Sequence, residues 1–397
     1  MTARWRFLGS FVVGISLALV AVVAVLARAS DDQDPHARPF DNSERMGSHC
    51  LDCHAETNPG LLDQWRSSVH FKRDVGCADC HGTDHSKIFT SRGRVSAGVC
   101  ARCHERAYGE FLHSKHALAE ERLRSSVLFE GQPDAVREEA CLKCHRVGLK
   151  NDDGSVGRCN YCHMGHRFSA AEAREPESCA LCHVGPDYPQ WEAYKSSKHG
   201  ILYQLGRDEK TAPTCSTCHM PGGTHDDSAN LTIGTALNGG ILEGEVPPVR
   251  MDAISPDDFR ARRSKMVATC TACHSVRFSE DALAAADAVK AEANQYLAEA
   301  AEIIRGLHRD GLLKKPPDEI KSANPHALIL GPEQVFEEGS EVEQAFYRMF
   351  RFHYAQVFKG AYHHSPTITN RESEPNLKQD LSLIKQMAKQ LREREAR

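Results

Sequence analysis

The chain has 397 residues, of which 26% are charged and 41% hydrophobic, and its formal net charge is −5. This balance, without a basic stripe, gives no reason to expect nucleic-acid binding. The 16 cysteines are an unusual load for this length, so their spacing carries most of the information about function.

Residues 1–29 predict export. Arginines precede an uncharged apolar run from Phe7 to Ala27, and a polar, acidic stretch follows it. A positive end before an apolar run sends the rest of the chain across the inner membrane, so we expect a periplasmic protein. Ala27-Arg28-Ala29 fits a cleavage site, whereas the length of the run would span a bilayer and favours a retained anchor helix at residues 7–27. Both outcomes stay open, and residues 30–48 read as a polar tether.

Residues 49–278 contain eight copies of Cys-x-x-Cys-His, which use every cysteine of the chain. This is the attachment motif of c-type haem, in which the thiols bind the porphyrin and the histidine binds the iron as its proximal ligand. Zinc sites and disulfides also use paired cysteines, but neither explains a histidine after every pair. We therefore expect eight covalently bound haem c groups. The motifs are Cys50/Cys53/His54, Cys77/Cys80/His81, Cys100/Cys103/His104, Cys141/Cys144/His145, Cys159/Cys162/His163, Cys179/Cys182/His183, Cys215/Cys218/His219 and Cys270/Cys273/His274.

The remaining histidines are candidates for the second axial ligand. An electron-transfer haem usually has two axial ligands, whereas a catalytic haem keeps one face open for substrate. Local sequence context selects seven distal candidates for eight irons, which leaves one iron open. They are His70, His116 and His199 after serines, His85, His166 and His225 shortly after haem motifs, and His363, preferred over His364, at the end of a late helix. His36, His308 and His326 are expected to be ordinary solvated or packing residues.

Residues 279–397 form a helical C-terminal region. Helical spacing of apolar residues predicts helices over 279–309, 332–361 and 377–397, with a break at Pro316-Pro317. Strand patterns are sparse, so the fold class is mainly α: a multihaem cytochrome c array with irregular loops, followed by long helices. Whether these helices only cover the array or also mediate oligomers stays open.

Between Cys141 and Gly200 the intervening residues carry a further resemblance. Two haem motifs are followed by Arg-Phe-Ser-Ala-Ala-Glu, then Cys-Ala-Leu-Cys-His-Val-Gly-Pro-Asp, Trp-Glu-Ala-Tyr and Ser-Lys-His-Gly. Ala-Pro-Thr-Cys-Ser-Thr-Cys-His-Met, Gly-Thr-His-Asp and Cys-Thr-Ala-Cys-His-Ser-Val-Arg-Phe follow later. In order and spacing this resembles the octahaem hydroxylamine oxidoreductase family.

The resemblance implies one catalytic haem with an open distal face. Its motif would be the one before Arg-Phe-Ser-Ala-Ala-Glu, which contains Cys159, Cys162 and His163. An Asp-His pair after the next motif lines the distal pocket in the family, and here it reads Asp187-Tyr188. The implied catalytic residues are therefore His163, Asp187 and Tyr188, with tyrosine in place of the expected imidazole.

A second departure concerns the direction of the reaction. Hydroxylamine-oxidising members attach a tyrosine, which follows a His-x-x-Pro element, to the catalytic haem of a neighbouring subunit. Here the element is His363-His364-Ser365-Pro366, and no tyrosine follows it. The resemblance therefore implies the reductive type, acting on nitrite or hydroxylamine with ammonium as product.

The same resemblance implies partners. A membrane quinol dehydrogenase or a donor cytochrome would supply electrons, the substrate would be a small nitrogen oxide, and the chain would form a homotrimer. Two alternatives stay open: oxidation of hydroxylamine or hydrazine, and a multihaem electron-transfer protein without chemistry of its own.

Overall fold

The computed structural model describes residues 48–124, 129, 132–206, 211–230, 256–313 and 340–396. Within these ranges the elements are helical, apart from an isolated β-bridge between Lys150 and Val156. This confirms the mainly α fold class. No helix in the described ranges is long and apolar enough to cross a membrane. The predicted apolar segment from Phe7 to Ala27 lies outside them.

The chain divides into two compact units. One contains the described residues up to Val95 together with Gly165–Phe168, and the other contains Ser96–Met164 and the described residues from Ser169 onward. The region boundaries predicted from sequence texture, near residues 48 and 278, stay predictions.

The first unit has a small core. Leu62 and Trp65 are its buried apolar residues among those described, and the Trp65 indole donates a hydrogen bond to the Val75 carbonyl at 3.0 Å. So few buried side chains cannot stabilise a fold alone, and bound haem must supply most of the remaining apolar surface. The helices are α2 (Ser48–Thr57), α3 (Pro59–Ser67), α4 (Val69–Lys72), α5 (Cys77–His81) and α6 (His85–Thr90).

The haem motifs fold as single helical turns. Side chains three and four positions apart share one side of a helix, so both cysteines and the histidine of a motif face the same way. In α5 the Asp79 carboxylate accepts a hydrogen bond from the Gly76 amide at 2.8 Å, and in α17 (Cys215–His219) Thr217 accepts from the Thr214 amide at 3.0 Å. These caps fix where the turn begins.

The second unit begins with short helices that carry haem motifs and distal candidates. In chain order they are α7 (Ala97–Ala101), α8 (Glu105–Leu112), α9 (Ala119–Arg124), α11 (Asp134–Val136), the π-helix η2 (Arg137–Cys141), α12 (Leu142–His145), η3 (Arg146–Gly148), η4 (Cys159–Tyr161), α13 (Ala170–Arg174), α14 (Pro176–Ala180), α15 (Gln190–Ser196), α16 (Lys198–Gln204), α17, η5 (Pro221–Gly223) and α18 (Pro256–Cys270).

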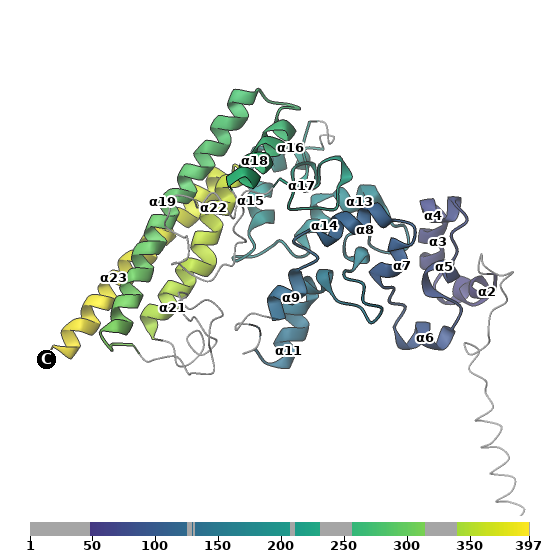
Figure 1. The fold of residues 1–397 in the computed structure, drawn as a ribbon, viewed down its shortest axis with the longest axis horizontal. Coiled ribbons are helices and arrows are strands. Elements are labelled where there is room, and N and C mark those ends of the chain that lie inside the picture. The colour runs from purple at the N-terminus through teal and green to yellow at the C-terminus, as the bar shows by residue number, and fades with distance from the viewer. Residues whose placement is uncertain are drawn as a thin grey trace, which may run out of the picture. The chain divides into compact units, whose positions relative to one another are not determined.

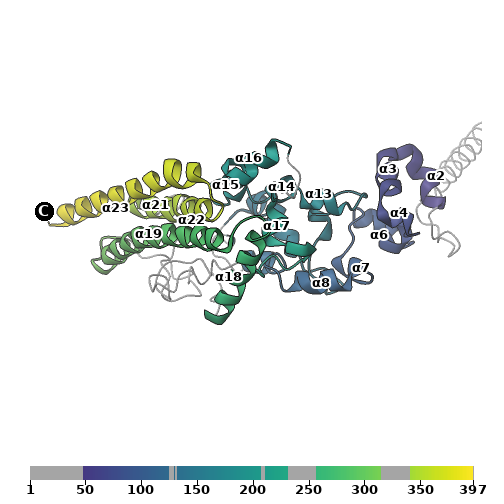
Figure 2. The ribbon, with the colours of Figure 1, turned by 90° about the horizontal axis from the view of Figure 1, so that it is seen from above.

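Long helices complete this unit (Figures 1 and 2). Predicted helix 279–309 is α19 (Val276–Arg309), which begins three residues early because the Ser275 hydroxyl caps it by accepting from the Phe278 amide at 3.2 Å. The described part of predicted helix 332–361 contains a π-helical segment. The third predicted helix is α23 (Glu374–Glu395). The remaining elements are α21 (Glu341–Arg348), the π-helix η6 (Met349–Tyr354), α22 (Ala355–Tyr362) and the π-helix η7 (Thr367–Ser373).

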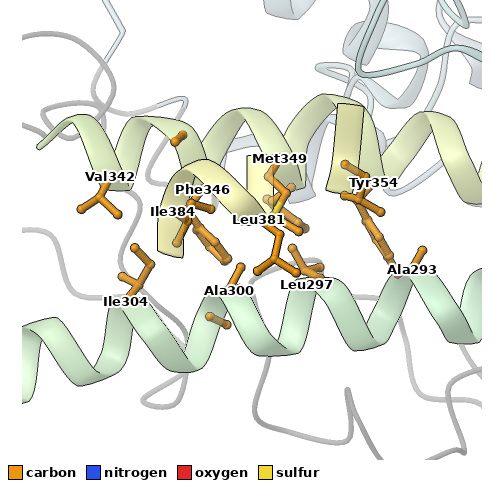
Figure 3. Close-up of a cluster of buried hydrophobic side chains, with 14 of the residues drawn as sticks. Ala293, Leu297, Ala300, Ile304, Val342, Phe346, Met349, Tyr354, Leu381 and Ile384 are labelled. Carbon is orange, nitrogen blue, oxygen red and sulfur yellow. The ribbon is translucent and has the colours of Figure 1, made fainter. Parts of the chain in front are cut away.

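These helices enclose an apolar core. Leu297 and Ile304 of α19 face Phe346 and Met349, and Ile384 of α23 joins them (Figure 3). Each of these side chains is at most 1% exposed. The C-terminal region therefore has a conventional hydrophobic core, unlike the haem-motif segments.

Candidate haem sites and candidate active site

Six proximal histidines face a second imidazole. Every one of these distal partners was expected from the sequence to be an iron ligand. Their ring centroids lie 6.0 to 6.3 Å apart. The pairs are His54–His85 and His81–His166 in the first unit, and His163–His225, His183–His116, His219–His363 and His274–His199 in the second.

This spacing fits haem iron between the rings. A bound imidazole nitrogen lies roughly 2 Å from its metal and the ring centroid about 1 Å further back, so two axial imidazoles have centroids about 6 Å apart. Burial lowers the pKa of His183 to about 3 and that of His219 to about 4. Both imidazoles are therefore neutral at pH 7, which is the form that binds iron.

Serine caps explain why three distal candidates share the pattern Ser-x-His. The hydroxyl of Ser68, Ser114 or Ser197 accepts a hydrogen bond from the amide three residues later, at 3.1 to 3.2 Å. The cap fixes the first turn and so orients the histidine inside it. These histidines are His70, His116 and His199.

In one proximal histidine and two distal candidates, a polar partner at Nδ1 leaves Nε2 available for iron. His145 Nδ1 lies 3.1 Å from the Ala119 carbonyl, and His363 Nδ1 lies 2.7 Å from the Lys359 carbonyl. His116 Nδ1 lies 3.2 Å from Asp227 Oδ2. Such partners fix the tautomer and orientation of a metal-binding imidazole.

His145 faces a phenol instead of an imidazole. The Tyr188 ring centroid lies 6.5 Å from that of His145, with the ring planes at 74°. The sequence resemblance placed Asp187 and Tyr188 opposite His163, and this placement is corrected, because His163 faces His225. The segment after the sixth motif folds back onto the fourth motif, which local spacing could not reveal. The candidate open face therefore belongs to His145.

Two cations surround Tyr188. Arg351 Nη2 donates to Asp187 Oδ2 at 2.8 Å, and Lys359 Nζ donates to the Asp187 backbone carbonyl at 2.8 Å. The Arg351 Cζ and Lys359 Nζ atoms lie 5.5 and 4.9 Å from the Tyr188 ring centroid. The loop that carries Asp187 is tied further by Gln356, whose amide donates to the Pro186 carbonyl at 3.3 Å.

Burial and charge set the ionisation of these cations. Burial, together with the charge of Arg351, lowers the pKa of Lys359 to about 8, and Asp187 opposes the shift. Lys359 is therefore mostly charged at pH 7.

Sequence reasoning missed Arg351 and Lys359, because the predicted helix that contains them was expected only to cover the haem array or to mediate oligomers. Eight residues apart, they would be about 80° apart around a regular α-helix. The π-helical segment Met349–Tyr354 turns less per residue and brings them closer to one face. The positions of Arg351 and Lys359, in a largely apolar helix shortly before His-x-x-Pro, were the available sign of a functional role. No feature of the sequence predicted the π-helical segment.

Other predicted residues are placed as follows. The His70 ring contacts Phe168 in the first unit, with centroids 4.8 Å apart, and its role as a distal ligand stays a prediction, as does the proximal role of His104. The exposed His364 has a backbone φ of +54°. His308 Nε2 lies 3.1 Å from Glu343 Oε1 on the bundle, which fits a packing role. His36 and His326 lie outside the described residues.

Neighbouring attachment motifs meet through their cysteines. The side chains of Cys144 and Cys182 are within hydrogen-bonding reach, which places the His145 motif beside the His183 motif. The same proximity joins Cys50 with Cys77, Cys100 with Cys159, and Cys179 with Cys215. Haems attached at such pairs would be neighbours.

The second cysteine of six motifs takes no part in these cysteine pairs. Cys53, Cys103, Cys162 and Cys273 are exposed, whereas Cys80 and Cys218 are half-buried. A bound porphyrin would lie against the motif that holds it, so the backbone of the motif must form the attachment turn. The backbone has the required turn, since the amides of Cys103 and Cys273 donate to the carbonyls three residues earlier at 3.2 and 3.1 Å. The thioether bonds at all 16 cysteines rest on the sequence motif and stay predictions.

Comparison with known proteins identifies the family. A family model described as "Seven times multi-haem cytochrome CxxCH" matches residues 46–317. The chain belongs to this multihaem cytochrome family. Covalently bound haem c follows from membership, and multihaem c-type cytochromes typically function outside the cytoplasm.

Curated relatives of this multihaem cytochrome are considerably longer. A probable nitrite reductase-hydroxylamine oxidoreductase fusion protein of Kuenenia stuttgartiensis is 26% identical, over 81% of this chain and 49% of the relative. The C-type polyheme cytochrome OmcC of Geobacter sulfurreducens is 24% identical, over 57% of this chain and 26% of the relative. The cytochrome thus spans about half of the first relative and about a quarter of the second.

Solved structures share the fold. A reducing HAO-like protein complex of Kuenenia stuttgartiensis has a TM-score of 0.68 at 22% identity, over 90% of this chain and 89% of that chain. A hypothetical multiheme protein has a TM-score of 0.70 at 19% identity, over 91% of this chain and 98% of that one. At these identities the match establishes the multihaem fold with its long C-terminal helices.

Proposed function

We propose that this cytochrome is a periplasmic octahaem reductase of nitrite, hydroxylamine or both, with ammonium as the product. The observation that carries the proposal is the contrast between His145 and the six imidazole pairs. Only a phenol, flanked by cations, faces His145 among the described residues that oppose a proximal imidazole. The nitrogen-oxide chemistry is supported by the similarity to the probable nitrite reductase-hydroxylamine oxidoreductase fusion protein of Kuenenia stuttgartiensis.

Reduction of nitrite to ammonium takes six electrons and eight protons. His145 would hold a haem c whose open face would supply a binding position for the substrate nitrogen and the electrons for its reduction. The chain itself must supply protons and hold the substrate. The Tyr188 hydroxyl can donate a proton, and the Arg351 guanidinium lies beside its ring, 5.5 Å from the centroid. Asp187 fixes that guanidinium through its 2.8 Å ion pair.

The wider assignments belong to the same proposal. Electrons would come from a membrane quinol dehydrogenase or a donor cytochrome, and the chain would form a homotrimer held by its helical region. The absence of a tyrosine after His363-His364-Ser365-Pro366 supports reduction over oxidation of hydroxylamine or hydrazine. Attachment to the membrane through residues 7–27 is part of the proposal as well.

The testing experiment is a reduction assay on purified holoprotein. Reduced methyl viologen is supplied, and nitrite, hydroxylamine and ammonium are followed separately. Viologen oxidation with stoichiometric ammonium supports the reductase. If neither substrate is consumed, the proposal is refuted, and oxidation of hydroxylamine with an artificial acceptor would then support the opposite direction of reaction.

One observation favours a second candidate, a pure electron-transfer protein. The separation of 6.5 Å between Tyr188 and His145 is close to that of the imidazole pairs, and tyrosine is a known haem ligand. A tyrosine ligand would close the face opposite His145. The spectrum of the oxidised protein distinguishes the two, because an open face gives a high-spin component that shifts on adding nitrite.

A further inference from the structure

The cationic pair beside Tyr188 comes from one helical stretch. Arg351 lies in η6 and Lys359 in α22, and both donate to the same residue, Asp187, at 2.8 Å. The π turn in η6 therefore brings two positive groups to one loop beside one ring. Neither group was needed to build the apolar core, since both are only half-buried while their neighbours Val357 and Phe358 are buried.

Among the described residues, the carboxylate that acts on both cations is that of Asp187. Asp187 offers one carboxylate, and Arg351 pairs with it. The acceptor of the Lys359 ammonium is a backbone carbonyl, which carries no net charge. One carboxylate between two cations leaves a net positive charge beside the face opposite His145.

We propose that Arg351 and Lys359 determine specificity for an anionic substrate, nitrite, over the uncharged hydroxylamine. This rests on the proposed function, because it names the substrate class of the same site. Guanidinium and ammonium groups bind oxyanions through charge-assisted hydrogen bonds, which neutral hydroxylamine cannot match. Partial exclusion of water near the haem strengthens the effect of the charges.

The experiment measures nitrite binding and turnover separately. Holoprotein with Lys359→Gln or Arg351→Gln is titrated with nitrite in the oxidised state, and the change in the visible spectrum gives Kd. Steady-state KM is then measured for nitrite and for hydroxylamine with reduced viologen. We expect Kd and KM for nitrite to rise about ten- to hundredfold. KM for hydroxylamine should change less than about threefold, since that substrate carries no charge.

Two controls protect the test. Lys385→Gln removes a cation from the outer surface of the bundle, where it pairs with Glu299 at 2.6 Å, and should leave nitrite binding unchanged. Lys359→Arg keeps the charge and should restore most of the affinity. Haem content per chain checks that each variant matures, and if one of the two Gln variants has reduced haem content, the other carries the test.

The outcomes are distinct from those of the proposed function. If wild-type protein binds nitrite but turns over neither substrate, weaker binding in the Gln variants still supports the anion site. Equal losses for nitrite and hydroxylamine would overturn it and assign the cations to haem propionates or to the loop. Unchanged nitrite binding in both variants, or no nitrite binding by the wild type, would also overturn it.

Discussion

Replacing Tyr188 by Phe removes one hydroxyl and keeps the ring opposite His145. The ring contacts of Lys359 at 4.9 Å and Arg351 at 5.5 Å persist, because phenylalanine also presents a π face. The ion pair between Arg351 and Asp187 does not involve the hydroxyl and should persist too. The change therefore isolates the proton donor from the packing of the site.

The expected magnitude follows from these contacts. A positioned acid contributes about 10²–10⁴-fold to a rate, so kcat for nitrite and for hydroxylamine should fall by at least about 100-fold in Tyr188→Phe. Nitrite affinity should change less than about threefold, because its charged partners remain.

The assay compares kcat, KM and nitrite Kd of wild type and variant under reduced viologen. Tyr203→Phe is the matched control, because its hydroxyl donates to the Glu177 carboxylate at 3.0 Å outside the candidate site. An unchanged kcat in Tyr188→Phe would refute the proton-donor role. A new high-spin haem with higher activity would instead show that Tyr188 is an iron ligand in the wild type.

Three further predictions follow from single contacts. In His225→Met the reduction potential of one haem should rise, because methionine replaces an imidazole opposite His163. The Kd for nitrite should stay unchanged. Loss of nitrite binding would instead assign the open face to His163. In Asp227→Asn, potentiometry should show one haem shifted upward on the order of 59 mV, since His116 loses its anionic partner at 3.2 Å; an unaltered titration would contradict this. Lys290 is fully buried with its Nζ unbonded, and burial lowers its pKa to about 8 from 10.5, roughly 3 kcal/mol of cost when charged. Lys290→Met should therefore raise Tm at pH 7. The gain should shrink between pH 8 and 10.5, because there Lys290 of the wild type is protonated in the unfolded state and neutral in the folded state. A gain in Tm that is independent of pH would contradict this.

Much of the haem chemistry was predictable because its determinants are local. Two cysteines and a histidine within one helical turn specify an attachment site whatever surrounds them. The serine two positions before His116 or His199 also acts locally, through a cap. The distal candidates that pair in the structure were therefore all recognised in the sequence.

Partner choice was not local. His163 and His225, like His219 and His363, come from segments far apart in the chain, and the spacing of motifs carries no information about which loop returns to which haem. The resemblance placed Tyr188 opposite His163, one motif too late.

The sequence by itself determined that this is a helical c-type multihaem protein, because Cys-x-x-Cys-His and helical periodicity act over a few residues. Only the tertiary structure decided that Tyr188 faces His145 and that Arg351 and Lys359 lie beside it. That arrangement depends on a π-helical turn and on a loop folded against distant helices. Both are set by packing among many residues, so no short stretch of sequence records them.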